Sequence, residues 1–527
     1  MSIAEMARAR AHEGMEIAAV AHVAPDRIAI ESEAGDRTFR ELNQRCNQIA
    51  RQLRDAGLRH GDAIALLCTN RPEFVEVRFA AHRLGLRLTP VNWHLAPEEV
   101  AYIIDNCEAK ALFADVRVSD AALAAAQLSE HLVIKSAVGG AINGFLDYED
   151  SLAGFSIEDI DQPSLGTQML YTSGTTGQPK GVLRDQPDPH AAAAMQELLT
   201  AVFQFEPDSG KDRALVTGPL YHSGPFNLCM STPLVAGIGV VIMDKWEPEK
   251  CLELIQQYHI THTFFVPTMF SRLLHLSASI RQAYDISSMR FIIHGAAPIA
   301  IDTKRQALDW FGSIIWEMFA GTEGPGTIVS PQEWLAKPGT VGRPGPAQML
   351  ICDQQGEQVA AGVEGQIWLV NPKDSSFEYY RSPEKTRQAQ QKEGYFTAGD
   401  IGLIDEDGYL FITGRHAEVI ISGGVNIYPQ EIDDILMAHE SVADVACVGV
   451  PNDDMGEEVK ALVQLCKGVA PSEALARELI AFCEAKLAKQ KWPRSVGFLD
   501  TIARSEAGKV YRYKLRDAYW LDRERKV

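Results

Sequence analysis

The segment Tyr171-Thr-Ser-Gly-Thr-Thr-Gly-Gln-Pro-Lys-Gly181 is the part of this chain that says most about its fold. The ten residues after Tyr171 contain four hydroxyl side chains, three glycines and a lysine. Glycines let successive backbone N–H groups turn toward an anion, hydroxyls add donors that rotate, and Lys180 adds a positive charge. A flexible surface loop can have the same composition, but a lysine fixed by Pro179 favours a loop that binds phosphate.

This segment does not follow the G-x-x-x-x-G-K-[ST] pattern of the P-loop. Gly174 and Gly177 are too close together, Pro179 interrupts any continuation into a helix, and Gly181 follows the lysine. We therefore expect a nucleotide site of a different design. The residues predicted to bind phosphate are Thr172, Ser173, Gly174, Thr175, Thr176, Gly177 and Lys180.

Length and composition indicate an ordinary globular protein with more than one domain. The chain has 527 residues, of which 46% are hydrophobic and 23% are charged. A single hydrophobic core stops growing at about 250–300 residues, so at least two domains are expected. The apolar stretch at 234–243 is too short to span a bilayer, and residues 1–16 do not resemble a secretory leader.

The nine cysteines are scattered and include no C-x-x-C pair. This pattern indicates reduced thiols in a cytoplasmic protein and no cysteine-based metal cluster. The net charge of −20 disfavours nonspecific binding to nucleic acid. Residues 486–527, however, contain 12 Lys and Arg against 5 Asp and Glu, a local charge of +7. This segment is either a solvated basic tail or a patch that meets a polyanionic small molecule.

Apolar runs alternate with helical patterns along most of the first 340 residues. Thr38-Phe-Arg-Glu41 has the form of a capping box, and a helix is predicted from there to Gly57. Other predicted strands and helices are 63–68, 72–84, 88–91, 214–219, 240–243, 249–258, 263–266 and 291–294. Such alternation indicates an α/β region with a largely parallel sheet.

The pattern changes after Pro344, where short apolar runs are separated by turns such as 353–356 and 405–408. We expect a small β-rich subdomain there. Beyond Gly414, a strand at 442–450 and a helix at 472–488 predict a compact α+β domain of about a hundred residues.

Five segments occur in an order that resembles the adenylate-forming superfamily. They are YTSGTTGQPKGV at 171–182, FAGTEG at 319–324, YFTAGDIG at 395–402, GRHAEVIISGGVNIYPQEID at 414–433 and EAGKVYRYKLR at 506–516. That superfamily includes acyl-CoA synthetases, non-ribosomal adenylation domains and firefly luciferase. In it, an acid attacks the α-phosphate of ATP to give an acyl-adenylate and pyrophosphate, and a thiol then displaces AMP.

The resemblance covers nearly the whole chain and implies its domain organisation. A large N-terminal domain, 1–413, would bind ATP and the acid, and it would contain α/β-layered subdomains and the small β-rich subdomain. Residues 414–417 would form a hinge, and a small mobile α+β domain would occupy 418–527. At the hinge this chain has Ala417 where relatives commonly have Asp or Lys, so the rotation is expected without a side-chain role at that position.

The resemblance also assigns roles in the first half-reaction. Thr322 would contact the α-phosphate and Glu323 would hold Mg2+, a cation that prefers oxygen ligands. Lys509 would bridge the substrate carboxylate and the α-phosphate and neutralise charge as the bond forms. Asp400 would accept both ribose hydroxyls, and Arg415 would add a donor. The remaining predicted nucleotide-binding residues are Gly295, Ala296, Ala297, Phe319, Ala320 and Gly321.

For the second half-reaction, Ser422, Gly423 and Gly424 would line a narrow passage for the pantetheine arm of coenzyme A. His222 would gate the space between acid and thiol, and a structural histidine is the competing interpretation. The predicted acyl contacts are Tyr221, Phe264, Val266 and Met269.

These contacts are apolar, which predicts a hydrophobic monocarboxylic acid, either a medium- or long-chain fatty acid or a bulky ring-bearing acid such as a steroid side-chain acid. Aryl acids of the benzoate or cinnamate type are the first alternative. A ligase that loads a carrier protein, a luciferase-like oxygenase and a nucleotide-binding protein without turnover are the others. We expect ATP, Mg2+ and coenzyme A as cofactor and co-substrates, a small-molecule acid as partner, and no nucleic acid. The oligomeric state is left open, a homodimer included.

Overall fold

The structure is a computed structural model, and it describes residues 2–172, 179–185, 188–345, 348–371, 376–423, 425–505 and 508–521. The chain forms two compact units. The first unit contains Met1–Phe265, Ala278–Ile292 and Asn371–Gln388, and the second contains Val266–Ser277, Ile293–Val370 and Ala389–Val527. The domain boundaries expected at 413 and 417 remain a prediction.

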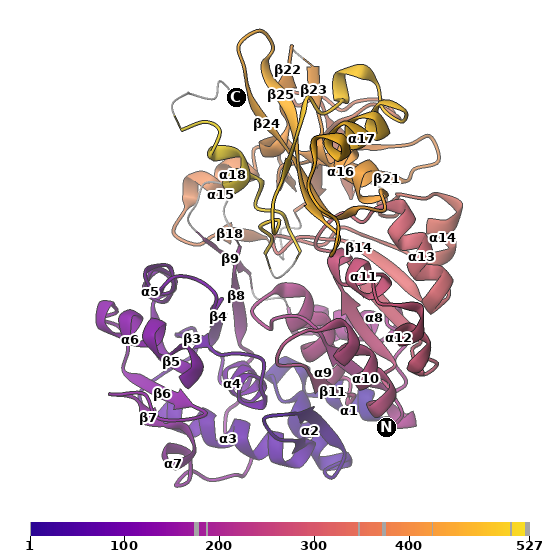
Figure 1. Ribbon diagram of the computed structural model, residues 1–527. Coiled ribbons are helices and arrows are strands. Elements are labelled where there is room, and N and C mark those ends of the chain that lie inside the picture. Colours follow the sequence, from indigo (N-terminus) through magenta and orange to yellow (C-terminus); the bar gives the residue numbers. More distant parts are fainter. Residues whose placement is uncertain are drawn as a thin grey trace. The chain divides into compact units, whose positions relative to one another are not determined.

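The first unit contains an eight-stranded sheet (Figure 1). In order across the sheet, its strands are β18 (Phe377–Tyr379), β9 (Lys180–Arg184), β8 (Thr167–Thr172), β4 (Arg87–Pro90), β3 (Ala63–Leu67), β5 (Ala109–Asp115), β6 (Ile134–Val138) and β7 (Leu146–Asp147). The six strands from β8 to β7 are parallel to their neighbours, whereas β9 and β18 are antiparallel. Strand β3 is buried at every residue, as expected for a parallel sheet covered on both faces.

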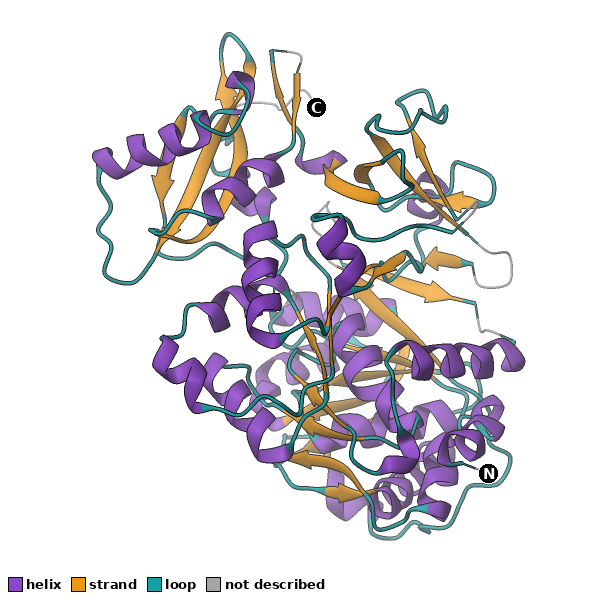
Figure 2. Cartoon of the chain, turned by 90° about the vertical axis from the view of Figure 1, so that its right-hand side faces the viewer, coloured by secondary structure: helices purple, strands orange, loops and turns teal. Residues whose placement is uncertain are grey.

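The first unit contributes five neighbouring strands to a second sheet. They are β12 (His262–Phe265), β10 (Arg213–Val216), β11 (Gly239–Ile242), β1 (Ile28–Ser32) and β2 (Arg37–Thr38). All neighbours are parallel except β1 and β2. Helices accompany the strands of both sheets (Figure 2). They are α1 (Ile3–Ala9), α2 (Glu16–Val23), α3 (Phe39–Asp55), α4 (Pro72–Arg83), α5 (Pro97–Asn106), α6 (Ser119–Leu128), α7 (Tyr148–Leu152), α8 (Pro189–Val202), α9 (Thr232–Val235), α10 (Pro248–Tyr258) and α12 (Ala278–Ala283).

The second unit begins with short α/β elements. These are α11 (Pro267–Leu274), the end of β13 (Phe291–His294), α13 (Ile301–Phe311), β14 (Ile315–Phe319), β15 (Thr327–Val329) and α14 (Pro331–Ala336). An antiparallel β-rich region follows. Its strands are β16 (Met349–Cys352), β17 (Gly365–Val370), β19 (Tyr395–Phe396), β20 (Asp400–Ile404) and β21 (Leu410–Arg415). Helix α15 (Pro383–Ala389) precedes β19 in the chain, but all of it except Ala389 belongs to the first unit.

The last part of the second unit is a five-stranded sheet with helices. Its elements are β22 (Ile420–Ser422), β23 (Val425–Ile427), α16 (Pro429–Met437), β24 (Val442–Asn452), β25 (Gly456–Leu465), α17 (Glu473–Glu484), β26 (Ser495–Phe498) and α18 (Arg512–Asp517). Residues from β22, β24, β25, α16 and α17 form one buried apolar core, which includes Ile420, Val445 and Leu479. This region therefore has a core of its own.

The predicted α/β fold class is confirmed, and most predicted elements lie within a few residues of their expected bounds. The capping box at the start of α3 forms as expected, because the Thr38 hydroxyl accepts from the Glu41 N–H and the Glu41 carboxylate accepts from the Thr38 N–H. The helix predicted over 472–488 is shorter, since α17 ends at Glu484. The predicted turns at 353–356 and 405–408 are both closed by backbone hydrogen bonds.

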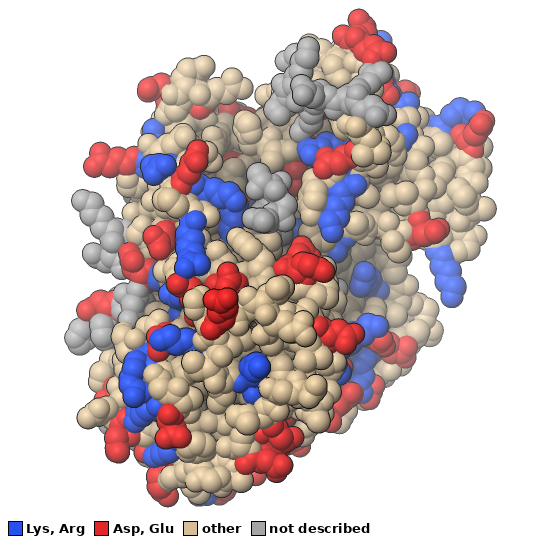
Figure 3. All heavy atoms as spheres, turned by 90° about the vertical axis from the view of Figure 1, so that its left-hand side faces the viewer, with Lys and Arg blue, Asp and Glu red and all other residues tan. Residues whose placement is uncertain are grey.

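All nine cysteines are free thiols, and all except Cys466 are buried. Across the described ranges, no helix combines the length and the apolar character needed to cross a bilayer. On the face drawn in Figure 3, acidic and basic side chains are interspersed.

Candidate active site

The phosphate-binding segment connects two paired strands of the first unit. Thr172 ends β8 and lies opposite Lys180, the first residue of β9. The Lys180 ammonium lies 4.8 Å from the centre of the Tyr379 ring on β18, a cation–π contact. Five predicted phosphate ligands fall outside the described residues. They are Ser173, Gly174, Thr175, Thr176 and Gly177.

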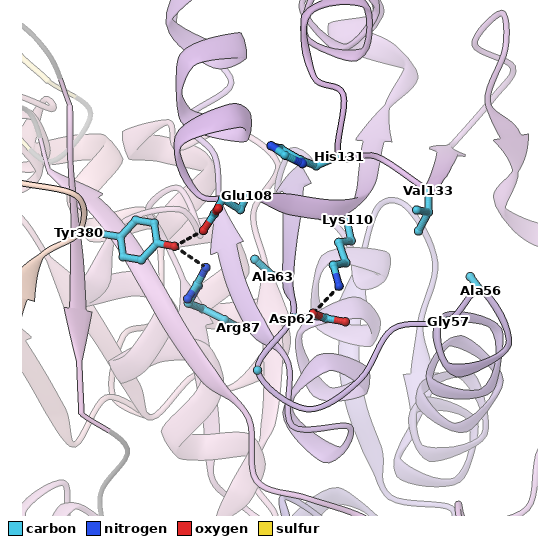
Figure 4. Close-up of a pocket in the computed structure, with 11 residues that line it drawn as sticks. Ala56, Gly57, Asp62, Ala63, Arg87, Glu108, Lys110, His131, Val133 and Tyr380 are labelled. Carbon is cyan, nitrogen blue, oxygen red and sulfur yellow. Dashed lines mark hydrogen bonds and ion pairs between the residues drawn. The ribbon is translucent and has the colours of Figure 1, made fainter.

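The position of Thr172 in the sheet suits a ligand site. Because β8 is parallel to β4, Thr172 lies at the carboxyl edge of the parallel strands, where open α/β sheets bind their ligands. At the opposite edge, a polar pocket of about 410 Å³ includes Ala63, Arg87 and residues beside the start of β5 (Figure 4). None of the predicted site residues lines this pocket. Lys110 and Asp62 form an ion pair of 2.7 Å within it.

An aromatic and histidine cluster surrounds Tyr221 in the first unit. The Tyr221 hydroxyl lies 2.9 Å from Nδ1 of His94. The Trp93 ring stacks on His94 with centroids 3.5 Å apart, and the His222 ring lies 4.5 Å from that of Tyr221. Sequence patterns gave no sign of Trp93 or His94, because both precede Tyr221 by more than 120 residues and contact it only through the fold.

Phe264, another predicted acyl contact, lies close to the backbone in the same unit. A Cβ on Gly224 would lie 2.9 Å from the Phe264 ring, so a larger residue there would displace the ring. A π-helical segment, Pro225–Ser231, follows Gly224 directly, and such segments are frequent at functional sites. Val266 and Met269 belong to the second unit. The joint acyl lining therefore remains a prediction.

In the second unit, the segment Gly295-Ala296-Ala297 follows the end of β13. A Cβ on Gly295 would lie 2.5 Å from the Met318 carbonyl oxygen, so this position requires glycine. Ala296 has φ of +70°, a left-handed conformation that costs a non-glycine residue about 1 kcal/mol or more. Strain of this kind is concentrated at ligand sites and agrees with the predicted contact to the nucleotide.

Buried charges lie beside the same segment. The Lys304 ammonium lies 2.5 Å from a Glu317 oxygen, and His294 lies 3.4 Å from the same oxygen. Burial opposes ionisation of Glu317, but its interactions with His294 and Lys304 lower its pKa to about 2. The sequence gives no indication of this pair. It ties α13 to β14 beneath the predicted nucleotide segment.

The segment Phe319-Ala-Gly-Thr-Glu323 forms the turn between β14 and β15. The Gly321 N–H donates to the Gly324 carbonyl at 3.1 Å, which closes the turn. A Glu323 oxygen lies 3.0 Å from the position that a Cβ on Gly321 would occupy. Thr322 and Glu323 are both partly exposed, so both can reach a ligand.

Asp400 and Arg415 are cross-strand partners in the antiparallel pair β20 and β21. Their side chains therefore lie on one face, and Nε of Arg415 donates to Asp400 Oδ1 at 2.9 Å. The Asp400 carboxylate raises the pKa of Arg415. The pair is assembled by strand register between residues 15 positions apart.

Lys509 lies on a short hairpin held by side-chain contacts. The Ser505 N–H donates to the Lys509 carbonyl at 2.8 Å, and Arg504 and Val510 form an isolated β-bridge. Arg504 donates to both oxygens of Asp444 on β24, at 2.7 and 2.6 Å, and to the Gly508 carbonyl. This bidentate pair fixes the orientation of the hairpin.

The tip of the hairpin lies against the start of α11. A Cβ on Gly508, whose φ is +77°, would lie 3.3 Å from the Thr268 hydroxyl and 3.6 Å from Cβ of Val266. Lys509 follows directly. The segment bearing Lys509 thus meets residues about 240 positions earlier in the chain, within one compact unit.

The surroundings of Lys509 are dominated by other charges. The Arg415 guanidinium is the main cause that lowers the pKa of Lys509 to about 8, and loss of hydration adds to it. Asp400, Glu323 and Glu418 oppose the shift. The second unit therefore brings together four predicted site residues, Glu323, Asp400, Arg415 and Lys509.

Ser422 and Gly423 lie at the tight turn between β22 and β23. Ser422 pairs with Val425 on one side and Gly456 on the other. Gly423 has φ of +57°, and a Cβ there would lie 2.3 Å from the Met455 methyl group. Both features favour glycine. Gly424 lies outside the described residues.

The donor set at Glu323 fits Mg2+. Within the described segments, no group of three or more His, Cys, Asp or Glu side chains could hold a metal ion by itself. Mg2+ is usually held by one or two carboxylates together with water and substrate phosphates, and the partly exposed Glu323 can supply one such carboxylate. Glu323 would hold the ion, and the ion would neutralise phosphate charge.

Models of known families and the sequences of known proteins match this chain over nearly its whole length. The model of the AMP-binding enzyme family matches residues 17–380, and that of the AMP-binding enzyme C-terminal domain matches residues 431–509. The chain therefore belongs to the AMP-binding enzyme family, and it is an adenylate-forming enzyme of the acid–thiol ligase class.

Three curated relatives illustrate the similarity. A 2-succinylbenzoate–CoA ligase of Geobacillus kaustophilus is 31% identical over 94% of this chain and 96% of the relative. An indoleacetate–CoA ligase of Aromatoleum aromaticum is 31% identical over 96% of each chain. A fatty acid–[acyl-carrier-protein] ligase of Streptomyces coeruleorubidus is 30% identical over 95% of each chain.

The solved structures agree on the fold. The crystal structure of an anthranilate CoA ligase in complex with anthranoyl-AMP has a TM-score of 0.86, with 24% identity over 99% of this chain and 98% of that one. ATP, Mg2+ and coenzyme A are the cofactor and co-substrates of adenylate-forming CoA ligases, as expected from the sequence. A large N-terminal and a small C-terminal domain are confirmed as the architecture.

Proposed function

We propose that this enzyme activates an aryl or aryl-substituted alkanoic acid with ATP and transfers the acyl group to coenzyme A. The observation that carries this proposal is the similarity to two relatives that are named as CoA ligases for 2-succinylbenzoate and indoleacetate. The sequence favoured a fatty or steroid side-chain acid and kept aryl acids as the alternative. The relatives support the alternative better.

The cluster around Tyr221 supports an aromatic substrate. Trp93, His94 and His222 surround a residue that the family resemblance places at the acyl group. Flat aromatic side chains pack well against an aryl ring. The His94 and Tyr221 pair would also offer a polar contact to a ring substituent, whereas a long alkyl chain would leave that contact unused.

The roles of the remaining residues follow from their surroundings. Lys509 would bring a positive charge to the substrate carboxylate and the α-phosphate as the new bond forms. Asp400, held by Arg415, would accept the ribose hydroxyls. Lys180 would neutralise the departing pyrophosphate. Charge placed in advance at these positions stabilises the transition state without reorganisation.

A second candidate is a ligase that transfers the acyl group to a carrier protein. One relative is named as a fatty acid–[acyl-carrier-protein] ligase at nearly the same identity. The conformation of Gly423 suits a passage for a pantetheine arm, which both coenzyme A and carrier proteins possess. A protein without turnover is disfavoured by the intact Lys509 and Glu323. We also propose that the enzyme is cytoplasmic, as the sequence predicts.

One assay separates these possibilities. Pyrophosphate release is measured with benzoate, cinnamate, indoleacetate, 2-succinylbenzoate, octanoate, palmitate and a steroid side-chain acid, each with and without coenzyme A. The thioester is identified by mass. We expect the highest kcat/KM with an aryl acid and a thioester only when coenzyme A is present.

Two outcomes would contradict the proposal. A preference for octanoate or palmitate would restore the fatty-acid interpretation. Pyrophosphate release without a coenzyme A thioester would favour a carrier protein as acceptor.

A further inference from the structure

A buried asparagine joins the two sheets of the first unit at the ends of their strands. Asn70 lies between β3 and α4, just past the carboxyl end of β3, and only 8% of it is exposed. Its amide nitrogen donates to the Gly218 carbonyl at 3.0 Å and to the Met243 carbonyl at 3.1 Å. Gly218 follows β10 and Met243 follows β11. Asn70 therefore connects one strand of the first sheet to two strands of the second.

The amide oxygen of Asn70 holds the next part of the chain. It accepts from the Leu220 N–H at 2.9 Å, so the side chain bonds to the backbone on both sides of Pro219. The three residues that it bonds, Gly218, Leu220 and Met243, are buried. Aspartate and leucine have nearly the same size, but ionised aspartate cannot donate and leucine can neither donate nor accept. The two donors and one acceptor explain why this position carries asparagine.

The segment that Asn70 holds leads directly into two predicted site residues, Tyr221 and His222. Residues 217–222 are all described, and they form a turn outside the helices and strands. The Tyr221 hydroxyl is held from another part of the chain, at 2.9 Å from Nδ1 of His94. Asn70 fixes the backbone before the ring, and His94 contacts the end of the ring.

Loss of the Asn70 amide would leave three buried backbone groups without their partner. Such groups are costly to leave unpaired, so the turn would shift to find other partners. That shift would move the Tyr221 ring, which the family resemblance assigns to the acyl group. A misplacement of about 1 Å can lower a reaction rate by up to 10²-fold. The effect of Asn70 would thus be felt at the acid without direct contact.

We propose that Asn70 is a positioning residue for the carboxylic acid substrate and acts by holding the backbone that carries Tyr221. This inference rests on the proposed function, in which Tyr221 contacts the acid. A residue that only stabilises the fold would change the melting temperature and leave both KM values in place. A residue that positions Tyr221 would raise the KM for the acid and leave the KM for ATP unchanged.

The test compares Asn70→Ala with the wild type in the full chain. Pyrophosphate release is measured with the preferred acid varied at saturating ATP, and then with ATP varied at saturating acid. We expect the KM for the acid to rise about tenfold. The KM for ATP should stay within about twofold of the wild type. All measurements are made below the melting temperature of every variant.

Asn43→Ala is the matched control. Asn43 is also a buried asparagine of the first unit, with 7% of it exposed. It donates to Asp159 and accepts from Arg83, both at 2.8 Å, and both partners lie outside the 217–222 turn. Its loss also leaves buried polar groups without a partner, so its melting temperature should fall as well. Its KM for the acid should remain that of the wild type.

Asn70→Ser is the milder variant if Asn70→Ala does not fold. The serine hydroxyl is shorter, but it can still donate to one buried carbonyl. We expect its KM for the acid to lie above that of Asn43→Ala, again with an unchanged KM for ATP.

A double-mutant cycle tests whether Asn70 acts through Tyr221. Tyr221→Ala removes the ring that Asn70 is proposed to position. Asn70→Ala should then raise the KM for the acid much less in the Tyr221→Ala background than in the wild type, because coupled residues are not additive. Two effects that multiply in full would contradict the proposed route.

The inference would be overturned if the KM for the acid in the Asn70 variant stayed within about twofold of the Asn43→Ala value. Equal increases in the KM for the acid and for ATP would also overturn it. Failure of the proposed function looks different. A wild-type enzyme that uses no aryl acid would reveal that failure without any mutation.

Discussion

Two lysines predicted to meet ATP, Lys180 and Lys509, are held in very different ways. Lys180 begins a strand, lies opposite Thr172 in a regular β-ladder and rests on the Tyr379 ring. Lys509 lies on a short hairpin whose orientation depends on an ion pair between Arg504 and Asp444. Its pKa is lowered chiefly by Arg415, 94 residues earlier in the chain.

The roles proposed for these two lysines divide two electrostatic tasks of one reaction. A lysine held by strand pairing and a ring contact has a defined position, which suits the binding of a leaving group. A lysine on a hairpin, with a pKa near the working pH, is more sensitive to its neighbours. We therefore expect mutations and pH to affect the two sites differently.

The largest effect is expected for Lys509→Ala. Removing a charge placed at the reacting atoms should lower the rate of adenylate formation by about 10³-fold. Transfer from preformed acyl-adenylate to coenzyme A should remain largely intact. The two half-reactions are measured separately, by pyrophosphate release and by thioester formation. An equal loss of rate in both half-reactions would contradict the role of Lys509 in adenylate formation.

Lys180→Ala should have the next largest effect, a decrease in adenylate formation of about 10²-fold. Because Lys180 is assigned to the pyrophosphate, its loss should also raise the KM for ATP. Lys211→Ala, at an exposed position of the same unit, serves as the control. A variant with normal pyrophosphate release would show that the loop holds phosphate without this charge.

Arg504→Ala tests whether the hairpin needs its anchor. Removal of the bidentate pair should leave the Lys509 ammonium present but poorly oriented. A misplacement of about 1 Å can lower a reaction rate by up to 10²-fold. We expect about a tenfold loss in adenylate formation. Asp444→Asn should cause a smaller loss in the same half-reaction. A transfer step that falls in parallel would indicate a general loss of folding.

The smallest effect is a shift in pH dependence. Lys509 acts as a cation, and its folded-state pKa is about 8, so kcat/KM for adenylation should fall as the pH rises through about 8. Lys509→Arg stays protonated and should remove this decline. Arg415→Gln removes the charge that lowers the pKa and should move the decline to higher pH. A decline unchanged in Lys509→Arg would assign it to another group.

Much of the fold was predictable because its signals are local. The capping box at Thr38 and Glu41 formed as expected, and β13 begins and ends at its predicted residues. The turn glycines are also local features, since Gly423 adopts a positive φ that glycine tolerates. Helix α17 ended four residues early, because a helical pattern alone does not mark a C-terminus without a stop signal.

Contacts between distant residues could not be predicted in this way. Trp93 and His94 reach Tyr221 only through the fold, and the Lys304–Glu317 pair is buried beneath a segment whose sequence looked like a plain turn. Patterns in a single amino-acid sequence predict only interactions between residues a few positions apart. They contain no information on which strand edges share a partner.

By itself, the sequence determined the family and the residue types proposed for the site: a glycine- and hydroxyl-rich segment, an aspartate and a lysine near the end of the chain. Tertiary structure alone decided the electrostatics. It placed Arg415 near enough to Lys509 to lower its pKa and aligned β22 and β26 on one edge of β25. The reason is physical, since charge interactions depend on distance in space, and that distance is set by packing and strand register.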